Sequence, residues 1–483
     1  ELSSCGPTLR FESRFESGNL RAASRISEYE YDLCLRNDIN TQCHTQWFFF
    51  RIRGLKQGHS YMFNIVNLRK PGSQFNEGMQ PVLFSTKCAN RGEPGWRRVG
   101  KDVCYFENHL KDAFSIEKKS FLYTLSFTIE SNFDPDDHVF LSYCYPFTYT
   151  DCARHLKSIV KEKKRADVVQ RSTLCHTLCG NPVDLLRITA PSGGEERRKK
   201  AIVVTGRVHP GETVASWMMK GFIDFITSES RIAVLLRRLF EFYVVPMLNP
   251  DGVINGNHRC SLAGVDLNRQ YLHPEQKLHP TIFHTKNMVK DIQKDREVLM
   301  VIDLHGHSRK KNIFIYGNAL DSAPSNTVTE RTFPFMLSRI SNVFSFQDCC
   351  FKVQKAKESA ARVVYWKELG IPYSYTIESS FCSCSTGPMK DVLFTPEHLE
   401  TLGGRELCEA LLDFCNPDSL TVAVRELEIY MSDHADKAGD SDLDEDGQGQ
   451  REKGSRKKID KKKKLVGGKK KLVSKKKKEI KII

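Results

Sequence analysis

Short runs in which hydrophobic and polar positions alternate dominate the first part of the chain. They occupy residues 47–53, 61–66, 121–127 and 138–143, with turn-forming residues between them. Alternation with a period of two is typical of strands that bury one face, and turns at this spacing favour antiparallel sheets. The pattern therefore predicts an N-terminal antiparallel β-sandwich over residues 1–147.

Beyond residue 147 the pattern changes to apolar runs separated by helix-like segments. Residues 200–208 and 297–303 form two such runs, each rich in apolar and β-branched residues, and residues 373–380 form another β-like run. Runs of this kind are typical of strands that are buried on both faces. Their alternation with helices predicts an α/β/α domain, which we assign to residues 148–431.

The charge of the chain is concentrated at its C-terminus. Residues 451–483 contain 17 Lys and Arg against 3 Asp and Glu, and the resulting +14 equals the formal net charge of the whole chain. Residues 433–446 are acidic, and the apolar content past residue 432 is too low for a core. We therefore expect a disordered tail over residues 432–483, acidic at first and then lysine-rich. Such a tail binds polyanions of any kind, so it predicts no specific nucleic-acid or membrane partner.

The composition favours an intracellular protein. The 16 cysteines are scattered without the spacing of a disulfide framework, as expected in a reducing compartment. The sequence contains no apolar run of 18 residues and no secretory-type apolar segment near its start, so it predicts neither export nor membrane insertion. Because residue 1 is a glutamate, we expect the natural N-terminus to be longer.

Metal-ligating side chains follow two of the predicted buried strands. His209 and Glu212 belong to a His-Pro-Gly-Glu run after the first strand, and His305 follows the strand at 297–303. A catalytic Zn²⁺ takes three nitrogen or oxygen ligands from the protein and leaves one position open for water. Since α/β sheets place their sites at strand ends, we predict a zinc site at these three residues. His307 competes with His305 for the third position, because spacing alone does not separate them.

Two further clusters complete the candidate chemistry. Glu378 lies near the end of the β-like run at 373–380, and a glutamate near a zinc site is the usual general base. Its alternative interpretation is an ordinary acid at a strand end. An Asn-Pro-Asp-Gly turn after residue 248 leads into residues 257–269, a loop-like run with two arginines, two asparagines and an aspartate. These groups are suited to gripping a carboxylate and holding a polarised carbonyl.

The ordered set of motifs resembles the zinc metallocarboxypeptidases, specifically their cytosolic carboxypeptidase branch. The set comprises His-Pro-Gly-Glu, Asn-Pro-Asp-Gly, Asp-Leu-Asn-Arg, Asp-Leu-His-Gly-His-Ser and Tyr-Thr-Ile-Glu. The resemblance covers residues 145–415, and residues 11–20 are similar to the N-terminal domain that accompanies the catalytic domain in this branch. It implies that residues 148–431 form a zinc carboxypeptidase catalytic domain with a mixed central sheet.

The resemblance also implies a complete metal site. His209, Glu212 and His305 would bind one Zn²⁺, and the family pattern favours His305 over His307. Asp266 would accept a hydrogen bond from His209 and orient it.

The same resemblance implies the catalytic and substrate-binding residues. Glu378 would activate the attacking water and pass its proton to the leaving amine. Arg259 would stabilise the tetrahedral oxyanion. Asn268 and Arg269 would bind the terminal α-carboxylate of the substrate, which makes the enzyme an exopeptidase.

The sequence departs from the digestive carboxypeptidases upstream of the catalytic glutamate. There the digestive enzymes carry a flap tyrosine, whereas residues 352–362 contain no tyrosine but do contain Lys352, Lys355, Lys357 and Arg362. A basic side chain in the pocket for the terminal residue would prefer an acidic one. We favour Arg362 for this position, while each lysine taken singly fits a solvated basic loop equally well.

The sequence therefore predicts a monomeric, cytoplasmic zinc exopeptidase that removes C-terminal residues, above all glutamates, from proteins. By resemblance, its substrate and partner would be polyglutamylated tubulin or an encoded acidic C-terminus. Microtubule structures such as the cilium, centriole and basal body would be its sites of action, and the lysine-rich tail would allow nuclear import. Two alternatives stay open: a zinc amidohydrolase acting on N-acyl amino acids, and a noncatalytic protein that binds microtubules or other polyanions.

Overall fold

The computed structural model describes residues 8–114, 120–191, 198–319 and 328–434. The described residues all belong to one compact unit. The predicted tail falls outside them almost entirely, because residues 435–483 are not described. None of the helices in the described part of the chain has the length and apolar character needed to cross a membrane.

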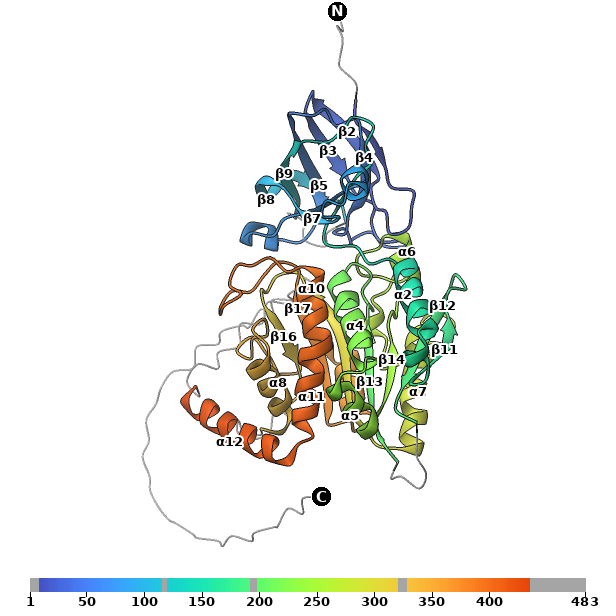
Figure 1. Cartoon of the computed structure of the whole chain (residues 1–483). Helices are drawn as coiled ribbons and strands as arrows, with labels where there is room; N and C mark the ends of the chain where they lie inside the picture. Colours follow the sequence, from blue (N-terminus) through green and yellow to red (C-terminus); the bar gives the residue numbers. More distant parts are fainter. Residues whose placement is uncertain (1–7, 115–119, 192–197, 320–327, 435–483) are drawn as a thin grey trace, which may run out of the picture. The chain divides into compact units, whose positions relative to one another are not determined.

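The N-terminal part of the chain forms two five-stranded sheets (Figure 1). Its elements are β1 (Arg10–Glu12), β2 (Ala22–Ser27), β3 (Glu30–Cys34), β4 (Phe49–Arg53), β5 (His59–Leu68), η1 (Gln74–Glu77), β6 (Val82–Ser85), α1 (Thr86–Asn90), β7 (Arg97–Arg98), β8 (Lys101–Lys111), β9 (Phe121–Ser131) and β10 (Val139–Ser142). The strand orders are β1-β4-β10-β6-β7 and β2-β3-β5-β9-β8. Every pairing is antiparallel except the parallel pair of β3 and β5.

An aromatic core joins the two N-terminal sheets. Phe50 of β4 and Phe63 of β5 are fully buried, and the ring of Phe11 in β1 lies 6.1 Å from the first and 6.3 Å from the second. Alternate positions of each strand point to opposite faces, so these rings line the inner faces of the two sheets. The predicted β-sandwich is thereby confirmed.

The rest of the chain is built on one seven-stranded mixed sheet. Its strands are β11 (Val169–His176), β12 (Pro182–Ile188), β13 (Lys200–Gly206), β14 (Phe240–Val245), β15 (Val298–His307), β16 (Ile313–Tyr316) and β17 (Tyr373–Ser380). The order is β11-β12-β14-β13-β15-β17-β16. The four inner strands β14, β13, β15 and β17 run parallel, and the outer strands pair antiparallel.

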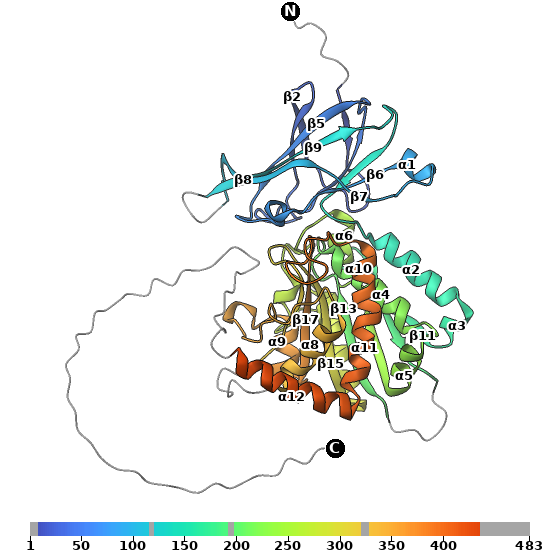
Figure 2. The same cartoon turned by 60° about the vertical axis from the view of Figure 1, so that its left-hand side comes forward.

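Helices cover both faces of this central sheet (Figure 2). They are α2 (Tyr149–Lys161), α3 (Lys163–Ala166), α4 (Thr213–Ile226), α5 (Arg231–Leu239), α6 (Pro250–Asn255), η2 (Leu267–Arg269), α7 (Pro280–Asp295), α8 (Thr329–Ile340), η3 (Lys355–Lys357), α9 (Ala361–Lys367), α10 (Pro396–Thr401), the π-helical turn η4 (Leu402–Glu406), α11 (Leu407–Phe414) and α12 (Pro417–Asp433). Ile202 and Val204 of β13 pack in one core with α4, α5, α8 and α11. Ala201 and Val203 pack in a second core with α7 and α9. Both faces of the strand are therefore apolar, and the predicted α/β/α arrangement is confirmed.

Two local predictions need correction. The Asn-Pro-Asp-Gly run, which we expected to form a turn, begins helix α6: Asn249 accepts a hydrogen bond from the N–H of Gly252, and Pro250 occupies the first turn. Asparagine as N-cap and proline at the first helical position favour this helix start. Helix α12 also continues to Asp433, beyond residue 432, where we expected the tail to begin.

Loops of the N-terminal sheets contact the loops at the carboxyl end of the central sheet. Gln74 Nε2 donates to the carbonyl of Lys310 at 2.6 Å and to Ser380 Oγ at 2.8 Å. Arg98 Nη2 donates to the carbonyl of Phe381 at 2.7 Å. Both segments that follow β15 and β17 are therefore held from the N-terminal part.

Candidate metal centre and substrate pocket

The loop between β13 and α4 is fixed by a buried arginine. Arg207 adopts a positive φ of 58° at the start of this loop. Its guanidinium donates to the carbonyls of Pro210 at 2.8 Å and Phe147 at 3.0 Å, and to Ser216 Oγ at 2.7 Å. Burial lowers the pKa of Arg207 to about 9, so the group stays charged at neutral pH. The loop that carries His209 is thus tied to its own backbone and to the residues before α2.

Three buried donor groups meet at the end of this loop. Glu212 Oε1 lies 2.7 Å from His209 Nδ1, and Glu212 Oε2 lies 3.1 Å from His305 Nδ1. One ligand atom of each residue lies within 4.8 Å of the others, and among the described residues this is the one group of three that could hold a metal ion. Two imidazole nitrogens and a carboxylate are a donor set that Zn²⁺ accepts in catalytic sites.

Charge interactions inside the group favour the deprotonated glutamate. Burial raises the pKa of Glu212, but the neighbouring His209 and His305 hold it well below its usual range. The Glu212 carboxylate also accepts the backbone N–H of Gly306 at 2.9 Å. A carboxylate that stays ionised and is held by a strand backbone suits a metal ligand.

Each of the two histidines has a carboxylate behind it. His209 Nε2 lies 3.0 Å from Asp266 Oδ1, and His305 Nε2 lies 2.7 Å from Asp303 Oδ2. The other oxygen of Asp303 accepts a hydrogen bond from Thr205 Oγ1 at 2.7 Å. Such partners fix the orientation of an imidazole and leave its Nδ1 for a metal.

His307 lies apart from the donor group. Its Nδ1 accepts the backbone N–H of Lys310 at 2.8 Å, and its ring centroid lies 5.3 Å from that of Phe314. Of the two histidines that the sequence left in competition, the structure brings His305 to Glu212.

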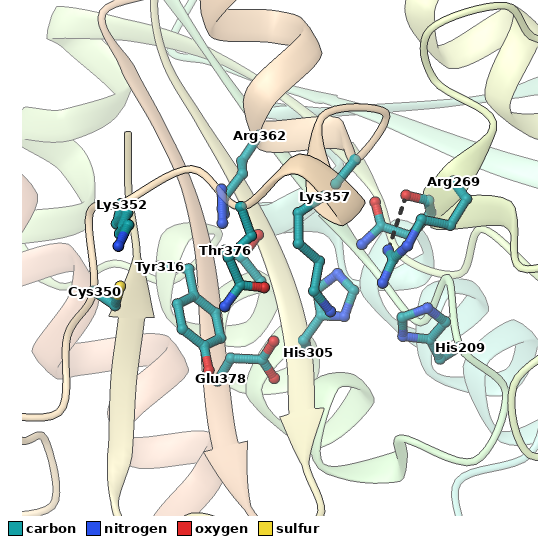
Figure 3. A pocket seen from close by; sticks show the side chains of 13 residues that line it. His209, Arg269, His305, Tyr316, Cys350, Lys352, Lys357, Arg362, Thr376 and Glu378 are labelled. Carbon is teal, nitrogen blue, oxygen red and sulfur yellow. Dashed lines mark hydrogen bonds between the residues drawn. The ribbon is translucent and has the colours of Figure 1, made fainter. Parts of the chain in front are cut away.

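Strand register brings Glu378 to the donor group. β17 pairs with β15 so that Glu378 stands opposite His305. Its side chain is 3% exposed, and it lines the same pocket as His209 and His305. Figure 3 shows the Glu378 carboxylate pointing into this pocket beside His305. A carboxylate at this position can take a proton from a water bound between it and a metal.

The pocket encloses about 590 Å³ of space, part of it open to solvent, and has a basic wall. Its lining residues are His209, Asn268, Arg269, His305, Tyr316, Cys350, Lys352, Gln354, Lys357, Ala360, Arg362, Thr376 and Glu378. Four of these side chains carry a positive charge, so the pocket attracts an acidic ligand.

Arg362 is the most deeply placed of these cations. Its side chain is 6% exposed, its guanidinium lies 5.6 Å from the ring centroid of Tyr316, and Nη1 lies 3.4 Å from Asn318 Oδ1. Burial lowers the pKa of Arg362 from its ordinary value. It forms no ion pair with any residue that the structure describes, and a buried cation of this kind favours an anionic ligand.

Asn268 and Arg269 line the opposite part of the pocket. The Asn268 amide oxygen accepts the N–H of Ala361 at 3.0 Å, which ties η2 to the start of α9. Arg269 Nη1 donates to the carbonyl of Asn268 at 3.2 Å and lies 3.8 Å from Asp266 Oδ2.

Arg259 and Asp266 do not line the pocket themselves. Arg259 Nη2 lies 2.7 Å from Asp266 Oδ2, and the other oxygen of Asp266 faces His209. Arg259 is 5% exposed, and burial raises the pKa of Asp266 while Arg259 and His209 hold it well below its usual range. Arg259 is therefore coupled to the donor group through one carboxylate.

Sequence reasoning missed several residues of this site. It noted the absence of a tyrosine from residues 352–362, yet Tyr316 enters the pocket from β16. The short apolar run Ile313–Tyr316 is a strand signal that would have directed attention to it. No sequence signal places Thr376, Cys350 or Gln354 in the pocket, because their positions depend on strand register and on the path of the 350–362 segment.

Comparison with protein families gives two matches. Residues 157–398 match the family described as zinc carboxypeptidase, and residues 11–125 match the cytosolic carboxypeptidase N-terminal domain. The first match spans the sheet and the loops that carry every residue of the pocket.

Individual proteins give the same picture. The chain is 48% identical over 418 residues to cytosolic carboxypeptidase 2 of Xenopus tropicalis, covering 86% of this chain and 42% of that protein. It is 48% identical over 416 residues to cytosolic carboxypeptidase 2 of Homo sapiens, covering 86% of this chain and 45% of that protein. The chain thus spans about half the length of these curated relatives.

A solved structure supports the fold. The metallo-carboxypeptidase from Burkholderia cenocepacia superposes with a TM-score of 0.68 at 21% identity, covering 87% of this chain and 100% of that one. The agreement extends over the N-terminal sheets as well as the central sheet, because it covers most of both chains.

Proposed function

Because the chain belongs to the zinc carboxypeptidase family, we propose that it is a zinc-dependent exopeptidase that removes C-terminal residues, and glutamates in particular, from proteins. One observation carries the proposal: a single pocket joins the His209, Glu212 and His305 donor group to Glu378 on one side and to basic side chains on the other. The names of the relatives agree with a carboxypeptidase.

The metal would be held by His209, Glu212 and His305. Zinc bound there would supply a Lewis acid that polarises the scissile carbonyl and lowers the pKa of the attacking water. Glu378 then accepts the proton of that water, because its carboxylate lines the pocket beside His305. It returns the proton to the leaving amine when the peptide bond breaks.

Asn268 and Arg269 bind the α-carboxylate of the terminal residue. The guanidinium offers paired donors to a carboxylate, and a chain without a free C-terminus presents no terminal carboxylate to them. The pocket is thereby restricted to chain ends. Arg259 stabilises the negative charge that develops on the carbonyl oxygen, and Asp266 holds it in place.

Arg362 and the lysines of the pocket favour an acidic terminal side chain. Arg362 is buried and forms no ion pair within the described part of the chain, and Lys352 and Lys357 line the same cavity. A glutamate side chain supplies an anion of the kind that a buried Arg362 favours. We propose polyglutamylated tubulin and encoded acidic C-termini as substrates, cleaved by a monomer in the cytoplasm and at microtubule structures. The lysine-rich tail, outside the described residues, would hold the enzyme near acidic polymers or mediate nuclear import.

Mass spectrometry of the reaction products tests the proposal. The zinc-loaded protein and its Glu378→Gln variant are incubated with polyglutamylated tubulin and with a peptide that ends in Glu-Glu-Glu. An amidated copy of the peptide is the control for the free C-terminus. We expect the unmodified protein to remove glutamates stepwise from polyglutamylated tubulin and from the free peptide but not from the amidated peptide, and the Glu378→Gln variant to remove none. Hydrolysis of N-acyl glutamate without peptide trimming would instead support an amidohydrolase, and zinc-loaded protein inactive on every substrate would contradict an enzymatic role.

A further inference from the structure

Three consecutive backbone N–H groups converge on one carboxylate of the N-terminal part. Asp38 lies between β3 and β4 and is 2% exposed. Its Oδ1 accepts the N–H of His258 at 2.6 Å. Its Oδ2 accepts the N–H groups of Arg259 and Cys260, each at 2.7 Å. Successive N–H groups that point at one centre form an anion-binding nest, and here a side chain far away in sequence fills it.

Neighbouring contacts hold the same two loops together. The N–H of Ile39 donates to Asn257 Oδ1 at 3.1 Å, and Asn40 Nδ2 donates to the carbonyl of Leu262 at 2.7 Å. These bonds lie on both sides of the nest along the chain. Asp38 is therefore seated at the centre of the contact rather than at its edge.

The nest connects directly to the metal loop. The carbonyl of His258 accepts the N–H of Gly211 at 2.7 Å, between His209 and Glu212. A Cβ on Gly211 would lie 2.3 Å from His258 Nδ1, so the two segments touch without spare room. The nest also includes the backbone of Arg259, whose guanidinium forms an ion pair with Asp266.

From this arrangement we infer that Asp38 is a positioning residue for the carboxypeptidase reaction: it fixes the backbone of residues 258–260 so that Arg259 reaches both Asp266 and the substrate carbonyl. The inference rests on the proposed function, because the role of Arg259 does. Asp38 itself touches neither the donor group nor the pocket. Burial raises the pKa of Asp38 to about 6 while the three N–H groups lower it, so the carboxylate is ionised at neutral pH.

Two substitutions in the full-length chain test the inference. Asp38→Ala empties the nest. Asp38→Asn keeps the shape and one acceptor oxygen but turns amide hydrogens toward backbone N–H groups. The matched control is Asp137→Asn, because Asp137 is also 2% exposed in the N-terminal part, yet its contacts are Ser85 Oγ and the N–H of Lys87, far from the nest. Zinc content and thermal unfolding are measured for each variant.

Steady-state kinetics on the Glu-Glu-Glu peptide separates positioning from binding and folding. In the zinc-loaded Asp38 variants we expect kcat to fall roughly tenfold to a hundredfold while KM changes little, because a misplaced oxyanion donor acts on the transition state. Formate should restore part of the kcat of Asp38→Ala by filling the nest, and should leave Asp137→Asn unchanged.

Hydrogen exchange of the backbone amides of residues 258–260 measures how well the loop is held, and it does not depend on an activity assay. We expect protection there to fall in Asp38→Ala and to stay unchanged in Asp137→Asn. If Asp38→Ala does not fold, the kinetics and the hydrogen exchange are both measured on Asp38→Asn. Unchanged protection, or an unchanged kcat in zinc-loaded Asp38 variants of an active enzyme, overturns the inference. An unmodified protein that does not trim the peptide overturns the proposed function instead.

Discussion

Asp303 Oδ2 lies 2.7 Å from Nε2 of His305, two residues further along the same strand. Thr205 Oγ1 donates to the second oxygen of Asp303, so the carboxylate is held between two strands. The imidazole is thereby turned with Nδ1 toward Glu212. The central sheet thus sets the orientation of His305, the proposed metal ligand, because Thr205, Asp303 and His305 belong to paired strands and Glu212 follows the loop after β13.

Substitution of Asp303 should weaken zinc binding. In Asp303→Asn the carboxamide keeps the volume but loses the charge that supports His305, and partners of this kind change metal affinity roughly tenfold to a hundredfold. Competition with a fluorescent chelator measures the Kd for zinc. Asp295→Asn, at the exposed end of α7, is the matched control and should leave the Kd unchanged. An unaltered Kd in Asp303→Asn would show that the hydrogen bond has no part in holding the metal.

Removal of the metal should destabilise the protein in a way that zinc reverses. A ligand that binds only the folded state at a hundred times its Kd adds about 2.7 kcal/mol to the free energy of unfolding. We therefore expect the Tm of chelator-treated protein to rise on addition of Zn²⁺ and to respond far less to Mg²⁺, which prefers oxygen ligands. Glu212→Gln should abolish the zinc response. A response that survives in this variant would mean that zinc binds elsewhere.

Arg362 should set the preference for an acidic terminal residue. Arg362→Met removes the buried cation, and the loss of one partner of a buried charge pair reduces binding by about 2–5 kcal/mol. For peptides that end in glutamate, we expect kcat/KM to fall by the factor that corresponds to this loss of binding free energy. For peptides that end in glutamine, we expect a far smaller fall. Lys355→Met is the control, because Lys355 is exposed on η3 and does not line the pocket. Equal losses on both peptides would argue for a structural role of Arg362.

Stability should fall in acid through Asp224 of α4. Burial raises the pKa of Asp224, but the hydrogen bond with His155 and the charges of His155 and Lys220 hold it well below its usual range. A carboxyl group with a lowered pKa stabilises the fold above its unfolded pKa of about 4, and this contribution is lost as the pH falls through the folded pKa. Asp224→Asn should therefore lower the Tm at pH 7, and the difference should shrink below about pH 4. Asp291→Asn, on the surface of α7, should show no such pH dependence.

The parts of the site that are local in sequence could be predicted from the pattern of residues. Glu378 was predicted as well, mainly through the family resemblance, but the strand register that brings it to His305 was not. His209 and Glu212 follow a strongly apolar run after a short gap, so their pairing and their place at a strand end were evident. The resemblance that these motifs suggested is confirmed by both family matches. The approach of Glu378 to His305 required the order β13-β15-β17, which periodicity does not specify.

Contacts between distant segments gave no sequence signal at all. Asp38 is a single acidic residue in a polar loop, and nothing in its neighbours distinguishes it from a solvated side chain. Its burial becomes visible only when the N-terminal loops meet residues 258–260. The error at Asn249 has a different cause, because asparagine and proline serve equally well in a turn and at a helix start, so these residue types alone do not distinguish the two.

The two walls of the pocket differ in the structure that supports them. His305 and Glu378 are held by ladder hydrogen bonds of neighbouring strands, whereas Lys352, Lys357 and Arg362 belong to a connecting segment that contains one short turn and the start of α9. Substitutions or length changes in that segment do not alter the register of the sheet. Under the proposed function, substitutions in this segment would change which terminal residue is released without altering His305 and Glu378. A library randomised at these three basic positions would therefore be a direct route to enzymes that trim other chain ends.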